Sequence, residues 1–238
     1  MNLLAIDTST DACSCALRVT DDKGERTLAR HLVEPKAHSR LLPGLAGDLL
    51  GEAGVDLRAL DAVAFGRGPG SFTGLRIACA VAQGIGFGAG CPLVAVSTLR
   101  TIAAGANRAK GAEHVLVALD ARMGEVYFGA FEYRQGMMEA VSNERVISPE
   151  AVELPRQGTW FAVGSGWIRY GGVLRGRTSA QIIDDDPSKT GRLPEAVDML
   201  DLAQRDFAAG NTLEPWAAAP VYLRNKVATA SPRRAPSA

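Results

Sequence analysis

The chain has 238 residues, 47% of them hydrophobic, and its 26 basic residues balance its 26 acidic ones. A chain of this length can form one large domain or two small ones that share a cleft, with a substantial core. Zero net charge excludes a general electrostatic surface for DNA or RNA, so a nucleic-acid role would need a local basic patch or a partner.

The amino-terminal sequence and the cysteines indicate a soluble cytoplasmic protein. MNLLAID lacks the charged, apolar and cleavage-site segments of a secretory signal, and no apolar run approaches about 18 residues. We therefore expect no membrane contact. Cys13, Cys15, Cys79 and Cys91 form no CxxC pattern, so we expect buried reduced thiols.

The first part of the chain has the element order of a ribonuclease-H-like lobe. Three β-rich runs separated by polar turns, LLAIDTS, CSCALRV and ERTLARHLVE, predict an antiparallel meander. Leucine spacing then predicts a helix over 38–53, followed by the strand ALDAVAFG, the loop GRGPGSFTG and an apolar helix over 72–87. The strand PLVAVS and a helix over 97–108 complete this order.

A second segment repeats the beginning of the chain. LLAIDTSTDACSCAL aligns without gaps on VLVALDARMGEVYFGA from the second residue of the latter, so that Asp7 falls on Asp120. This repeat predicts an internal duplication, with two similar halves facing a cleft. We expect an amino-terminal lobe over 1–108, a smaller lobe over 109–212 and a carboxyl-terminal segment over 213–238, whose end, SPRRAPSA, is expected to be disordered.

The later elements of the second half are less clearly marked. Their patterns predict a helix near Pro149, the strand GTWFAVGS, a helix from Gly166 and a helix over 194–209. The run QIIDDD lies between the last two of these.

Asp7 is the first candidate for chemistry, because it ends a predicted strand and is followed by hydroxyl side chains. The side chains and N–H groups of Thr8 and Ser9 could face a phosphate or a metal-bound water. Asp-Thr-Ser-Thr is also good turn chemistry on its own. Both interpretations stay open, so Asp7, Thr8, Ser9 and Asp120 are candidates for a vestigial nucleotide site.

The glycine loop and the histidines do not match known ligand motifs. GPGSFTG lies between a strand and a helix, where N–H groups favour anions, but no GxxxxGK[ST] pattern is present. His31, His38 and His114 form no HxxxH or HExxH pair, so no metal site is predicted.

The helix over 72–87 is apolar on nearly all sides, so one contact face does not account for it. Small residues recur every four positions along it and would permit close approach of another helix. The helix is either buried within the chain or, with the helix over 38–53, offers a two-helix face to a copy or a relative. The candidate interface residues are Leu42, Leu45, Leu49, Gly70, Phe72, Gly74, Leu75, Ala78 and Ala82.

Five segments together closely resemble the TsaB family, also called YeaZ, over almost the whole chain. They are LLAIDTSTDACSCAL, GRGPGSFTGLRIA, VSTL, LDARMGEVYFG and PVYLRN. The resemblance implies an α/β, actin/Hsp70-like (ASKHA) fold with two ribonuclease-H-like lobes from an internal duplication. It also implies a function in forming N6-threonylcarbamoyladenosine at position 37 of tRNA.

The resemblance further implies an accessory role. In this family the paralogue TsaD transfers the threonylcarbamoyl group, and the TsaB-like protein is a non-catalytic partner that dimerises with itself or with TsaD. The ATPase TsaE joins the assembly. This subunit would then need no cofactor of its own, ATP and Mg would be used by the complex, and tRNA would be reached only through it.

Two other functions are possible for this fold. One is an active ATP-dependent phosphotransferase or ATPase that uses Asp7 and Asp120 around Mg-ATP. The other is a metallopeptidase, which the missing histidine ligands disfavour.

Overall fold

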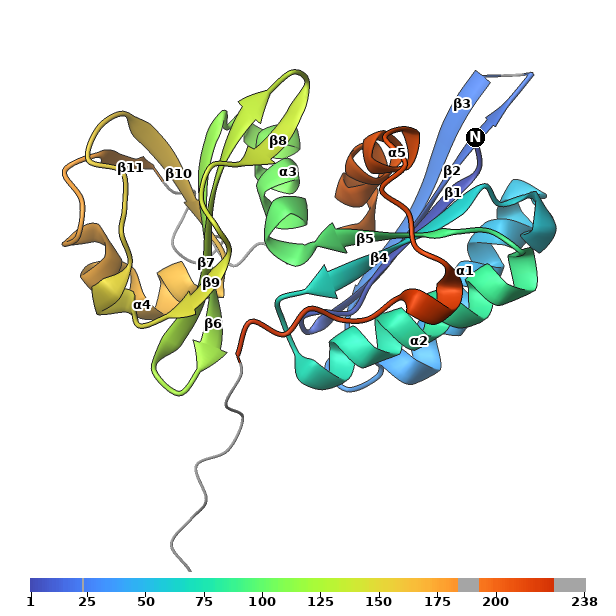
Figure 1. Cartoon of the computed structure of the whole chain (residues 1–238), viewed down its shortest axis with the longest axis horizontal. Coiled ribbons are helices and arrows are strands. Elements are labelled where there is room, and N and C mark those ends of the chain that lie inside the picture. The colour runs from blue at the N-terminus through green and yellow to red at the C-terminus, as the bar shows by residue number, and fades with distance from the viewer. Residues whose placement is uncertain (23, 184–192, 225–238) are drawn as a thin grey trace, which may run out of the picture.

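Two sheets of the same topology, placed side by side, organise the protein (Figure 1). The computed structural model describes residues 1–22, 24–183 and 193–224, so the predicted disordered end, SPRRAPSA, lies outside the described residues. Each sheet forms one lobe together with the helices that cover it.

The first sheet has the strand order β3-β2-β1-β4-β5. Its strands are β1 (Leu3–Asp7), β2 (Ala12–Asp21), β3 (Gly24–Val33), β4 (Ala62–Gly68) and β5 (Leu93–Ser97). The first three are antiparallel, whereas β4 runs parallel to β1 and β5 parallel to β4. Parallel neighbours require crossover connections, and helices provide them here.

The second sheet repeats this arrangement in the order β11-β10-β6-β7-β8. Its strands are β6 (His114–Arg122), β7 (Glu125–Arg134), β8 (Met137–Ala140), β10 (Thr159–Val163) and β11 (Gln181–Ile183), while β9 (Arg145–Ile147) pairs with β7. Again three antiparallel strands are followed by two parallel ones. The predicted α/β fold of two ribonuclease-H-like lobes is therefore confirmed.

Helices cover both faces of the first sheet. On one face lie α1 (His38–Ala53), the short η1 (Leu57–Ala59) and α2 (Phe72–Ala89). On the other face lie η3 (Ala196–Met199) and α5 (Leu200–Ala208). The strand β1 is consequently buried along its whole length, as expected for a central strand covered on both sides.

The second sheet lies between two other helices. The helix α3 (Thr98–Lys110) follows β5 of the first sheet and packs on one face of the second. The opposite face is covered by α4 (Ser165–Arg175) and η2 (Pro149–Ala151). The helix predicted near Pro149 is thus a single short turn, and the helix predicted over 194–209 begins as η3 before continuing as α5.

The end of the expected second lobe has to be corrected. The helix α5 lies on the first sheet, where Leu200 and Ala203 pack with Leu3 and Ala5. Leu213 then pairs with β5, and η4 (Pro215–Ala217) packs against α2. The expected lobe over 109–212 is therefore too long, because helical periodicity does not say which sheet a helix covers.

The described chain ends in a strap, residues 211–224, that joins the two lobes (Figure 1). The N–H of Val221 donates to the carbonyl of Arg67 over 2.8 Å, and the ring of Tyr222 lies 5.2 Å from that of Phe72. Arg224 crosses to the second lobe, where it donates to the carbonyl of Ala121 over 3.0 Å and pairs with Glu125. Residues 220–224 of the motif PVYLRN thus connect α2 and β4 to the hairpin between β6 and β7.

The apolar character of α2 has a structural explanation. The helix α2 is long enough and apolar enough to cross a membrane, judged by length and composition alone. Core helices of globular proteins meet the same criterion. One side of α2 packs on the first sheet, whereas another side of similar width is exposed.

Candidate functional site

Asp7 lies at the carboxyl end of β1 and is completely buried. Its Oδ1 accepts hydrogen bonds from the N–H of Ser9 over 2.8 Å and from the Ser9 hydroxyl over 2.7 Å. Its Oδ2 has no hydrogen-bond partner, and a Cβ at Gly66 would lie only 1.9 Å from it. Burial raises the pKa of Asp7 to about 6, although the bonds from Ser9 lower it.

The glycine loop packs directly on the residues that follow Asp7. The N–H of Ser71 donates to the carbonyl of Ser9 over 2.7 Å, and the Thr8 hydroxyl donates to the carbonyl of Gly74 over 2.8 Å. A Cβ at Gly74 would lie 1.9 Å from the Thr8 carbonyl oxygen. Glycine is therefore required here for close approach. Of the groups that could have faced a phosphate, the Thr8 hydroxyl contacts the loop, whereas the N–H and hydroxyl of Ser9 donate to Asp7.

Asp120 occupies the matching position of the second lobe, but its carboxylate is engaged in local contacts. Its Oδ1 accepts from the N–H of Arg122 over 3.0 Å, and its Oδ2 pairs with Arg169 over 3.1 Å. The N–H of Asp120 donates to the Ser165 hydroxyl at the start of α4. Asp120 therefore shapes the hairpin and holds α4.

The contacts of His38 and the burial of the four cysteines suit a structural role. Nε2 of His38 lies 2.9 Å from the carbonyl oxygen of Thr10 and joins α1 to the turn after β1. The four cysteines are buried and free, as predicted, and burial raises the pKa of Cys13 to about 11. Within residues 1–22, 24–183 and 193–224, no group of three or more His, Cys, Asp or Glu could hold a metal ion.

The predicted interface residues are mostly directed into the chain, and this is a correction. Those that are buried in the first lobe are Leu42, Leu49, Gly74, Leu75, Ala78 and Ala82. Leu45 and Gly70 are partly exposed, and Phe72 is 47% exposed. The small residues recurring along α2 thus let the helix approach its own sheet and the strand-end turn.

The opposite side of the same two helices is partly to fully exposed and rich in small residues. We call this the outer helix face, and it consists of Leu41, Gly44, Leu45, Gly47 and Gly51 on α1 with Ile77, Ala80, Val81 and Gly84 on α2. An added Cβ at any of these four glycines would meet only open space. Each glycine inside a helix costs roughly 0.5–1 kcal/mol relative to alanine, so the folding of this chain alone does not explain them.

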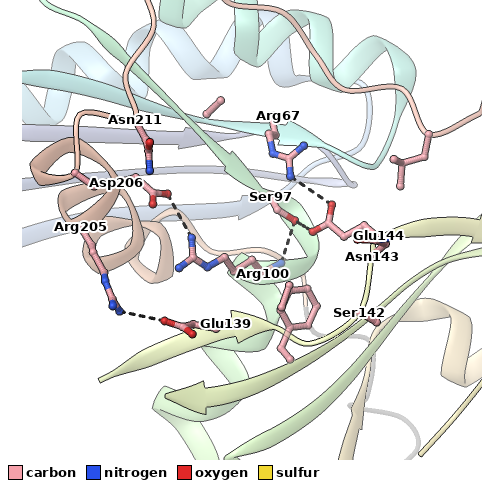
Figure 2. Close-up of a pocket in the computed structure, with 15 residues that line it drawn as sticks. Arg67, Ser97, Arg100, Glu139, Ser142, Asn143, Glu144, Arg205, Asp206 and Asn211 are labelled. Carbon is pink, nitrogen blue, oxygen red and sulfur yellow. Dashed lines mark hydrogen bonds and ion pairs between the residues drawn. The ribbon is translucent and has the colours of Figure 1, made fainter. Parts of the chain in front are cut away.

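A cavity of about 760 Å³ lies between the lobes (Figure 2). Arginines reach into it from three elements, and each pairs with a carboxylate. The pairs are Arg67 with Glu144 at 3.6 Å, Arg100 with Asp206 at 3.3 Å and Arg205 with Glu139 at 3.5 Å. Sequence patterns could not identify this cavity, because its lining comes from segments far apart in the chain.

The comparisons with known proteins agree with the resemblance. A family model described as tRNA N6-adenosine threonylcarbamoyltransferase, TsaD, matches residues 33–163. The tRNA threonylcarbamoyladenosine biosynthesis protein TsaB of Escherichia coli K12 is 42% identical over 96% of both chains, and that of Haemophilus influenzae is 37% identical over 95%. The solved structure of YeaZ from Pseudomonas aeruginosa superposes with a TM-score of 0.83 at 44% identity, covering 93% of this chain and 99% of that one.

Two glycines of α2 give a matched test of the close packing at Thr8. We expect Gly74→Ala to lower the free energy of unfolding by at least about 3 kcal/mol, because the methyl group would overlap the Thr8 carbonyl. We expect Gly84→Ala to raise it by about 0.5–1 kcal/mol, since that methyl would be in open space. Urea unfolding of both variants measures the difference, and equal effects would contradict the packing argument.

Asp7 should make stability depend on pH. Because its pKa is about 6 in the folded protein and 3.8 in the reference state, the folded state binds more protons between these values. The contribution of Asp7 to the free energy of unfolding should therefore fall by about 3 kcal/mol in total as the pH rises through this range. Urea unfolding of the unchanged chain and of Asp7→Asn across this range should give curves that diverge toward neutral pH, and parallel curves would show that Asp7 is not the cause.

Proposed function

Because this chain belongs to the TsaB family of tRNA threonylcarbamoyladenosine biosynthesis proteins, we propose that it serves this modification as a non-catalytic subunit that binds and activates TsaD. The observation that carries this proposal is the packing at Asp7. The carboxylate is buried against Gly66, and the following turn is covered by the glycine loop.

The surroundings of Asp7 and Asp120 weigh against the phosphotransferase or ATPase alternative. Such an enzyme would use carboxylates that can reach a magnesium ion or its bound water. Asp7 is completely buried, and Asp120 pairs with Arg169 and the N–H of Arg122. ATP and Mg belong to the complex in our proposal, and this subunit requires no cofactor of its own.

The outer helix face is the proposed partner surface. Its exposed glycines and Ala80 allow another backbone to come close, which would explain why glycine is kept inside α1. The TsaD family model matches residues 33–163, a span that includes α1 and α2. A TsaD chain of related fold could therefore present similar helices to this face.

The same surface would also support a homodimer. A two-fold axis would place the outer helix face of one copy against that of the other. Homodimer and heterodimer would then be mutually exclusive, so binding of TsaD would separate the homodimer. In this arrangement TsaE joins the assembled pair in the cytoplasm, and tRNA is bound through the complex.

Substitution of Ala80 tests the partner surface. Ala80→Glu should leave the far-ultraviolet circular dichroism unchanged, because the side chain is exposed in this chain. It should weaken association with TsaD by at least about 100-fold, since a charge would be buried without a partner in the interface. Isothermal titration with TsaD provides the measurement.

Two further alanines control this experiment. Ala208→Glu places the same charge at an exposed position of α5, on the other side of the first sheet, and should bind TsaD normally. Ala78→Glu should unfold the chain, because Ala78 is completely buried. Normal TsaD binding by Ala80→Glu would exclude this face as the interface.

The proposed function itself is tested by reconstitution. Threonylcarbamoyl transfer to unmodified tRNA is measured with TsaD, TsaE, ATP and threonylcarbamoyl-adenylate, with this chain present or omitted. We expect multiple-turnover product to be lost when the chain is omitted and restored when it is added. Undiminished product without it would refute the accessory role.

A further inference from the structure

A carboxylate of the second lobe occupies an anion position built by the first. Glu144, between β8 and β9, accepts a hydrogen bond from the hydroxyl of Ser97 and lies 3.6 Å from a guanidinium nitrogen of Arg67 (Figure 2). Ser97 is also the amino-terminal cap of α3, accepting from the N–H of Arg100. Glu144 therefore sits at the positive end of a helix beside a guanidinium.

The position of this carboxylate within the fold is one where ligands commonly bind. Arg67 and Ser97 lie at the carboxyl ends of β4 and β5, two parallel neighbours of the first sheet. Open α/β sheets bind ligands outside the carboxyl ends of their parallel strands. Glu144 thus stands where the anionic group of a ligand would be expected.

Desolvation disfavours the charged form of Glu144 at this position. Its side chain is only 12% exposed, and burial raises its pKa above the ordinary value for a glutamate. Ser97, Arg67 and Arg100 lower the pKa, but by less than burial raises it. An incoming anion would meet the same Ser97 hydroxyl and Arg67 guanidinium, so it could take the place of this side chain.

The cavity beside Glu144 has room for more than one anionic group. Its volume of about 760 Å³ lies in the range of pockets that hold small molecules. Arg100 and Arg205 contribute further guanidinium groups, which pair with the lining carboxylates of Asp206 and Glu139, and the amides of Asn143 and Asn211 add neutral hydrogen-bonding groups. This lining suits a polar molecule with an anionic end.

We propose that the cavity between the lobes binds a small polar molecule through its carboxylate or phosphate group, and that Glu144 occupies the anion position until such a molecule displaces it. Glu144 then fills the position of the ligand's anionic group when no ligand is bound. Displacement would also break the contact between Glu144 and Arg67, which joins the two lobes. This inference goes beyond the accessory role and concerns a different part of the molecule.

Removal of the glutamate carboxylate tests the anion position. Isothermal titration of the full-length chain with inorganic phosphate, and separately with acetate, is compared for the unchanged protein and for Glu144→Ala at constant ionic strength. We expect both anions to bind Glu144→Ala at one site at least about tenfold more tightly than the unchanged chain. A preference for phosphate over acetate or the reverse identifies which anionic group the site favours.

Three variants control the experiment. Glu144→Gln keeps the size of the side chain and should bind anions weakly, because the position stays filled, and it provides a folded reference if the alanine variant is unstable. Glu132→Ala removes a carboxylate that pairs with Arg134 on the same strand, β7, and should create no site. Arg67→Ala added to Glu144→Ala should abolish the gained binding.

Two outcomes would overturn the proposal. Absence of saturable anion binding in a folded Glu144→Ala variant would show that no anion position exists there. Equal binding with and without Arg67 would show a general ion effect. Because every titration uses this chain alone, neither outcome depends on whether it binds TsaD.

Discussion

The contact between the glycine loop and the turn after β1 is the constraint on which the rest of the first lobe depends. Gly74 lies so close to the carbonyl of Thr8 that no larger residue fits, and Ser71 donates to Ser9. This contact fixes where α2 begins, and therefore which side of α2 meets the sheet. It also leaves Asp7 buried beside Gly66, so the same packing that places the helix covers the residue suited to phosphate chemistry.

Charged contacts in two places join the lobes, in addition to α3, which follows β5 and packs on the second sheet. Arg224 of the strap donates to the hairpin after β6, whereas Arg67 and Arg205 pair with carboxylates across the cavity. These groups are partly buried, so salt screens their attraction less than it screens exposed pairs. The strap runs along α2, so a partner on the outer helix face would bind close to one connection between the lobes.

Local patterns predicted the fold well because the duplication repeats one supersecondary unit. Strand periodicity predicted the first sheet, and the match of Asp7 with Asp120 predicted β6 and β7 of the second, whereas β8 and β9 were not predicted. Periodicity did not show that α5 returns to the first sheet or which side of α2 is exposed, since both depend on tertiary packing. For α1, glycines inside a predicted helix were an available signal, because their cost to helix stability indicates another purpose.

The composition of α2 relates the outer helix face to the burial of Asp7, because both sides of this helix carry small residues. Its inner side needs small residues at Gly74, Ala78 and Ala82 to approach the sheet and the Thr8 carbonyl. Its outer side carries Ala80 and Gly84, which the fold does not require. A helix that served the interior alone would gain stability from alanine or another helix-forming residue in place of Gly84. Small residues on both sides of α2 therefore fit the two close contacts of our proposal, one within this chain and one with a partner.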